Sequence, residues 1–154
     1  MYKNLLVSED GSIVNPDVHD AHILGLVMIN KKKLLLPVRL TDGSNLCLAL
    51  SNIDCLRADD FREGNIILDI TVSRGTEVDM SDIAYAHGLE QLLSSEANAF
   101  LNKAMQDFFI GIKLFVQINP SYGCKLVCIC DEIQVLQNWA SVINAVRCAK
   151  PILP

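Results

Sequence analysis

The chain has 154 residues, of which 51% are hydrophobic and 20% are charged, and its formal net charge is −5. An apolar fraction this large excludes a disordered chain, and the length suits a single domain over residues 1–154 with one hydrophobic core. The acidic balance and the absence of any basic run beyond Lys31-Lys32-Lys33, which has no interleaved aromatic residues, argue against a nucleic-acid partner.

The first half of the chain predicts a succession of β-strands separated by turns. Residues 65–73 alternate between apolar and polar side chains, which indicates an antiparallel sheet with one buried face. Asp42-Gly43 is a hairpin turn signal, because glycine accepts the positive φ that such turns require. Pro37 has no amide hydrogen, so it is expected at a sheet edge or a bulge. The predicted strands cover residues 4–8, 22–30, 34–40, 45–50, 53–57 and 65–73.

The second half changes to a helical period. Apolar residues recur at helical spacing between residues 81 and 108, with Ser81 as the expected N-cap. Gly88 and the Ser94-Ser95 pair weaken the middle, so two helices or one broken helix is expected. Residues 110–118 and 125–135 predict a hairpin, and Trp139, Val142, Ile143 and Val146 predict a short C-terminal helix. The whole pattern predicts an α+β fold whose antiparallel sheet has about six to eight strands.

Targeting signals and cysteines bear on the compartment. No apolar run is long enough for a membrane-spanning helix, and the N-terminus turns acidic at Glu9-Asp10, too early for a secretory signal. We therefore expect a cytoplasmic protein without a membrane partner. Cys124, Cys128 and Cys130 lie in an apolar strand pattern, so we interpret them as buried free thiols instead of metal ligands.

One short stretch has the residue types of a reaction centre. His19-Asp20 could anchor a divalent metal ion, with Asp17 and His22 nearby, as in phosphohydrolases. Only His87 remains as a further histidine ligand, so a metal-dependent hydrolase stays an alternative hypothesis. The chain contains no glycine-rich phosphate loop and no nucleophile turn of the Gly-x-Ser-x-Gly type. We expect no catalytic residues and no cofactor.

The acidic residues are unevenly distributed along the chain. Residues 54–96 contain ten acids and three arginines, a charge of −7, and the rest of the chain carries +2. An acidic surface attracts basic partners and repels phosphate backbones.

Three segments resemble a group of small bacterial immunity proteins of polymorphic toxin systems. They are residues 18–25 (Val-His-Asp-Ala-His-Ile-Leu-Gly), 61–70 (Phe-Arg-Glu-Gly-Asn-Ile-Ile-Leu-Asp-Ile) and the closing hairpin 119–130. The resemblance implies a non-enzymatic inhibitor that occludes a toxin domain. An acidic surface fits this role, because many toxins that act on nucleic acids are basic.

If this resemblance holds, the partner-binding residues are expected among the acids beside the predicted strands and helix. The candidates are Asp59, Asp60, Glu63, Glu77, Asp79 and Asp82. Two other readings stay open at this point. One is a carrier whose core holds a small apolar ligand, and the other is a homodimer formed through an exposed strand edge.

Overall fold

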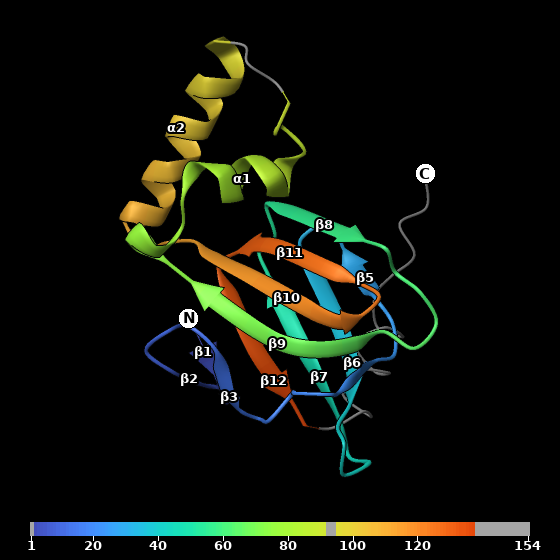
Figure 1. Ribbon diagram of the computed structural model, residues 1–154. Coiled ribbons are helices and arrows are strands. Elements are labelled where there is room, and N and C mark those ends of the chain that lie inside the picture. The colour runs from blue at the N-terminus through green and yellow to red at the C-terminus, as the bar shows by residue number, and fades with distance from the viewer. Residues whose placement is uncertain (1, 92–94, 138–154) are drawn as a thin grey trace.

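The computed structural model describes residues 2–91 and 95–137, and it confirms the α+β class (Figure 1). The twelve described strands are β1 (Tyr2–Lys3), β2 (Leu6–Val7), β3 (Ile13–Asn15), β4 (His22–Ile23), β5 (Val27–Asn30), β6 (Lys33–Arg39), β7 (Asn45–Ser51), β8 (Cys55–Asp59), β9 (Ile66–Ser73), β10 (Leu114–Tyr122), β11 (Lys125–Cys130) and β12 (Glu132–Leu136). The helical elements are the 3-10 helix η1 (Gly75–Glu77) and the α-helices α1 (Met80–His87) and α2 (Ser95–Phe109). Neither α-helix is long and apolar enough to cross a membrane.

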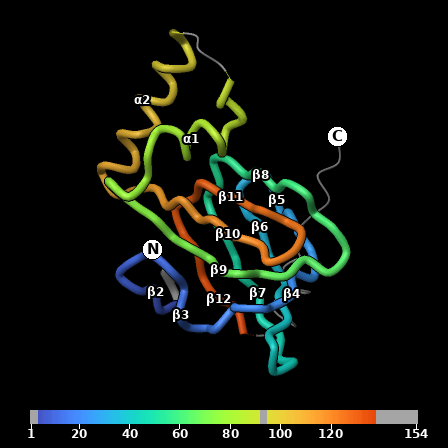
Figure 2. Tube along the Cα trace, viewed as in Figure 1, coloured from blue at the N-terminus to red at the C-terminus, as the bar shows by residue number. Residues whose placement is uncertain are grey.

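Ten strands form one sheet that folds into two layers. The strand order is β1-β12-β7-β6-β4-β9-β10-β11-β8, and β5 also pairs with β6. Strands β8, β11, β10 and β9 form a front layer, and β6, β7 and β12 lie behind it (Figures 1 and 2). Strand β4 joins the layers at one side, because it pairs with both β6 and β9. The sheet is larger than the predicted six to eight strands.

The main hydrophobic core lies between these two layers. Alternate residues of a strand point to opposite faces, so every second side chain of the front layer faces the rear layer. Strand β11 contributes Leu126, Cys128 and Cys130, which have no exposed surface. Leu34 and Leu36 of β6 belong to the same cluster. The three predicted core cysteines of residues 124–130 are therefore buried free thiols, as expected.

A change of layer follows β11. The sequence pattern predicted one strand over residues 125–135, but Asp131 separates β11 from β12. Strand β11 pairs with β10 in the front layer, whereas β12 pairs with β7 in the rear layer. The amide of Asp131 donates to the carbonyl of Ser51 at 3.1 Å. Asp131 and Glu132 interrupt the apolar pattern at this corner, and buried apolar side chains resume at Ile133 and Val135 of β12.

The predicted strand over residues 22–30 is also divided. It forms β4 and β5, which both pair with β6 and leave residues 24–26 between them. Pro37 lies on the interior strand β6, opposite this interruption, and its carbonyl accepts from the amide of Leu24 at 2.8 Å. Because N–H and C=O of one strand residue point to the same side, the missing amide faces the break. Proline is therefore accommodated by an irregularity in the neighbouring strand.

The central helical segment forms two helices, as predicted. Asp79, not Ser81, is the N-cap of α1, and its carboxylate accepts from the amide of Asp82 at 3.0 Å. Gly88 ends α1 with φ of 68°. The predicted C-terminal helix, with Trp139 and Val142, lies outside the described residues.

A buried asparagine joins the β8–β9 loop to the turn between β10 and β11. Asn65 is 2% exposed, and its Oδ1 accepts from the amides of Arg62 at 2.9 Å and Cys124 at 3.0 Å. Its Nδ2 donates to the carbonyl of Arg62. Gly123 passes so close that a Cβ there would overlap Asn65 Oδ1. The side chain thus replaces backbone pairing at a place where both loops leave the sheet.

This contact predicts a difference between two glycines with the same backbone conformation. Gly123 and Gly43 both have φ of 83°, but a Cβ at Gly43 would meet nothing within 4 Å. Both alanine variants incur the strain of the left-handed region, about 1–2 kcal/mol. Gly123→Ala should lose about 1–3 kcal/mol more, because it displaces a buried hydrogen-bonding group. Urea unfolding of both variants measures this difference, and equal losses would show that Asn65 tolerates the added methyl group.

Candidate functional site

The helices cover only part of the outer face of the front layer. Phe115, Val127 and Ile129 point outward from β10 and β11 and pack in one cluster with Ile83 of α1 and Phe108 of α2. Both helices lie at one end of this layer, and the rest of its outer face is not covered by either helix (Figure 1). Two functional surfaces therefore have to be considered, one beside the helices and one on the open part of the layer.

Exposed apolar side chains gather where α2 ends. Phe109 is 59% exposed, Ile110 66% and Ile112 53%. Gly111 has φ of 75°, and the chain turns there toward β10. Phe108, which directly precedes these exposed residues, is buried. Large apolar groups exposed next to one another are typical of interaction surfaces.

Three of the predicted partner-binding acids lie beside this turn. Val78 and Phe108 belong to the same buried cluster, and η1 contacts α2. Figure 1 shows η1 next to the C-terminal end of α2. We name this region the acidic–apolar face, and define it by Glu77, Asp79, Met80, Asp82, Phe109, Ile110 and Ile112.

The acids of this face also hold the local backbone. Glu77 Oε2 accepts from the amide of Arg74 at 3.1 Å, and Asp82 Oδ2 accepts from the amide of Asp79 at 3.2 Å. Asp79 accepts from the hydroxyl of Ser81 at 2.6 Å and from the amide of Asp82. The Ser81 hydrogen bond, followed by that amide, lowers the pKa of Asp79. Hydrogen bonds thus fix these carboxylates in position, so a partner would not have to order them.

The other three predicted acids lie at the opposite end of the front layer. Asp59 ends β8, and Asp60 and Glu63 lie in the loop that leads to β9. The eight residues of β9 separate this loop from η1, about 26 Å at about 3.3 Å per residue. The six predicted residues therefore form two groups instead of one continuous surface.

Asp59 is already engaged by the protein itself. Its carboxylate accepts from Tyr85 Oη at 2.7 Å and from Arg57 Nε at 2.9 Å. The Tyr85 hydrogen bond is the main cause that lowers the pKa of Asp59. Arg57 also donates to the carbonyl of Tyr85 at 2.8 Å and to Glu90, and its guanidinium stacks on the Tyr85 ring at 4.1 Å. This cluster ties the C-terminal turn of α1 to β8, so Asp59 has a structural explanation.

On the open part of the layer, three polar side chains are linked by hydrogen bonds. Gln117 Nε2 donates to Asn119 Oδ1 at 2.5 Å, and Asn119 Nδ2 donates to Asp69 Oδ1 at 2.7 Å. The register places Asn119 opposite Asp69 and Gln117 opposite Thr71. All four are only partly buried. Polar side chains that bond one another across strands are the ordinary solution for a solvated antiparallel face.

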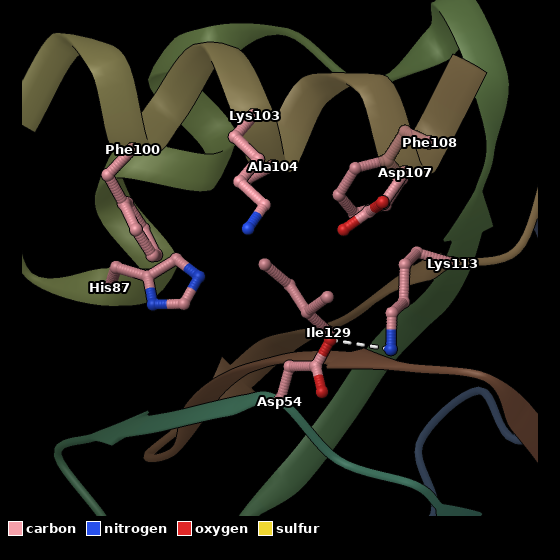
Figure 3. A pocket seen from close by; sticks show the side chains of 9 residues that line it. All are labelled: Asp54, His87, Phe100, Lys103, Ala104, Asp107, Phe108, Lys113 and Ile129. Atoms are coloured by element: carbon pink, nitrogen blue, oxygen red, sulfur yellow. Dashed lines mark ion pairs between the residues drawn. The ribbon is translucent and has the colours of Figure 1, made fainter. Parts of the chain in front are cut away.

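A pocket of about 290 Å³ lies between α2 and the front layer (Figure 3). Lys113 lies at one side of it, with its ammonium 2.5 Å from Asp54 and 2.7 Å from Asp131. Burial disfavours its charge, but the hydrogen bonds to Asp131 and Asp54 outweigh burial and raise the pKa of Lys113. His87 lies at the other side, and its ring packs edge-on against Phe100 with centroids 4.9 Å apart.

The His19-Asp20 stretch is a local turn on the surface. His19 Nδ1 lies 3.2 Å from Asp20 Oδ2, and both side chains are 60% exposed. Asp17 Oδ1 accepts from the amide of His19 at 3.1 Å. In the described part of the chain, no three His, Cys, Asp or Glu side chains are grouped to hold a metal ion. Burial raises the pKa of the Cys47 thiol to about 11, and burial also raises the pKa of the Cys124 thiol, so neither is primed as a thiolate nucleophile.

Two features of the candidate sites were not predicted from the sequence. Ile110 and Ile112 were predicted to lie in a strand of the closing hairpin, and Phe109 fell between that strand and the helical segment, whereas all three are exposed around the turn at Gly111. The pocket residues Asp54, His87 and Lys113 come from three distant segments. No local pattern could have brought them together.

The histidine in the pocket predicts a dependence of stability on pH. Burial lowers the pKa of His87 below its usual 6.5, so the unfolded chain binds the proton more readily than the folded one. Because protonation of His87 favours the unfolded chain, the free energy of unfolding should decrease as the pH falls from about 7 to about 5. His87→Gln should reduce this decrease, as measured by urea unfolding across that range. An equally steep profile in the variant would contradict a buried neutral imidazole.

Comparison with known proteins identifies no relative of this chain. No protein-family model, curated protein or solved structure matches it. The surfaces and contacts described above are therefore what bears on its function.

Proposed function

We propose that the chain is a non-enzymatic protein-binding module, an immunity-like protein that neutralises a basic toxin domain in the bacterial cytoplasm. The observation that carries this proposal is the acidic–apolar face, where exposed Phe109, Ile110 and Ile112 adjoin fixed carboxylates. This face contains half of the acids that the sequence resemblance indicated.

The apolar part of the face would supply affinity. Complete burial of a side chain such as phenylalanine or isoleucine contributes about 1.5–3 kcal/mol. Central aromatic and aliphatic side chains surrounded by polar groups are the usual arrangement of interface hot spots. Because Phe109, Ile110 and Ile112 are more than half exposed, most of this contribution is still available to a partner.

The acids would supply selectivity for a basic partner. Opposite charges accelerate association and disfavour partners of the wrong charge more than they add affinity. Glu77, Asp79 and Asp82 are held by backbone amides, so their ordering is already complete before binding. Asp59 is held by Arg57 and Tyr85, and we place the loop with Asp60 and Glu63 outside the main contact area.

The apolar contribution is tested by co-expression with a basic toxin domain, which we expect to be encoded beside this chain's gene. The wild-type chain should restore growth, and Ile110→Asp should weaken binding about tenfold or more. Met28→Asp is a matched control, because Met28 is 47% exposed on β5, which pairs with β6 of the rear layer. Growth that the wild-type chain does not restore, or equal binding by both variants, would contradict the proposal.

The acidic contribution is tested with neutral variants that keep the caps. Asparagine is as good an N-cap as aspartate, so the triple variant Glu77→Gln/Asp79→Asn/Asp82→Asn should retain its helix content by circular dichroism. Its association rate with the basic domain should fall, and the rate should depend less on salt. The comparison is Asp59→Asn/Asp60→Asn/Glu63→Gln, which should associate nearly as fast as the wild type. A larger effect of this second variant would move the contact area to the β8–β9 loop.

A further inference from the structure

The pocket of Figure 3 has an arrangement of charges that the protein-binding proposal does not use. Its apolar walls are Phe100, Ala104 and Phe108 of α2, with Ile129 of β11 below them. Its volume of about 290 Å³ is at the small end of ligand pockets, which span about 300–1,000 Å³. A ligand about the size of a single amino acid would fill it.

Two opposite charges of α2 are unpaired there. Lys103 and Asp107 are one helical turn apart, a spacing that allows an ion pair. Within residues 2–91 and 95–137, neither side chain forms a hydrogen bond or ion pair. Figure 3 shows the ammonium of Lys103 and the carboxylate of Asp107 both directed into the pocket. Each charge therefore lacks a counter-charge at the same small opening.

The remaining charges of the pocket are already compensated. Asp54 lies 2.5 Å from Lys113 and 3.3 Å from Lys32, and Lys113 also binds Asp131. These two carboxylates and two ammonium groups neutralise one another. The charge that a ligand would meet is thus the pair on α2.

The two opposite charges of this pair favour one class of ligand. A simple anion would satisfy Lys103 but would lie beside Asp107 and Asp54, and a simple cation would satisfy Asp107 but would meet Lys103. A molecule with one positive and one negative group satisfies both. The aromatic and aliphatic walls add the requirement for a large apolar group on the same molecule.

We infer that this pocket binds a free α-amino acid with an aromatic or large aliphatic side chain. The carboxylate lies at Lys103, the ammonium group lies at Asp107, and the side chain lies over Ile129 between Phe100 and Phe108. His87 closes the side next to Phe100. Its burial disfavours protonation, so it adds no third charge near neutral pH.

The test is calorimetric titration of the full chain with L-phenylalanine, L-tryptophan and L-leucine. At least one of them should bind, and its analogues should bind at least about tenfold more weakly, the loss expected for one charge-assisted hydrogen bond. For L-phenylalanine, 2-phenylethylamine lacks the carboxylate and 3-phenylpropanoate lacks the ammonium group. Glycine retains both charges but has no side chain, and it should not bind measurably.

Matched variants assign each charge. Asp107→Asn should reduce affinity for the amino acid at least about tenfold while leaving that for 3-phenylpropanoate unreduced, and Lys103→Met should do the same with respect to 2-phenylethylamine. Glu96→Gln removes an exposed charge from the first turn of α2 and should change nothing. Absence of binding by all three amino acids at millimolar concentration overturns the inference, as does equal binding of the singly charged analogues. Toxin neutralisation is a separate readout, so failure here leaves that proposal unaffected.

Discussion

The structure depends on one strand, β11, that is buried on both faces. Leu126, Cys128 and Cys130 face the rear layer, whereas Val127 and Ile129 face the helices. Because strand side chains alternate, a single extended segment can hold two hydrophobic clusters together. Without the outward pair, α1 and α2 would lose two of the three buried sheet side chains on which they pack. The acidic–apolar face and the pocket both exist because these helices are held there.

The sequence predicted most local elements correctly because each has its own physical signal. The alternation in residues 65–73 and the glycine of the 41–44 turn are properties of a few neighbouring residues. The interruption at residues 24–26 was missed because leucines continue through it, and the one at Asp131 was missed because apolar residues resume at Ile133. Pairing with β7 or β6 decides where such a run divides, and that is a property of distant residues. The cap of α1 was displaced by two residues for a related reason, since both Asp79 and Ser81 have capping side chains.

The count of charges along the sequence did not predict where the acidic residues lie on the surface. Residues 54–96 carry a charge of −7, but the fold places Asp60 and Glu63 in the loop before β9 and the acids of η1 and α1 after it. Several have local tasks: Asp79 and Asp82 cap α1, and Asp59 holds Arg57 and Tyr85. A carboxylate that accepts from a backbone amide can still attract a cation, whereas the charge of a carboxylate paired with an arginine is largely neutralised. This distinction favours the η1–α1 group over Asp59 for a partner, and only coordinates could reveal it.

Helix α2 contributes residues to both the acidic–apolar face and the pocket. A helix turns about 100° per residue, so Phe109 lies about 200° around the axis from Asp107. The side of α2 that carries Phe109 therefore differs from the side that carries Lys103, Ala104 and Asp107. Phe108 and Ile129 both pack in the helix cluster and also line the pocket. The packing of these two buried residues is therefore a physical connection between the pocket and the helices that carry the acidic–apolar face.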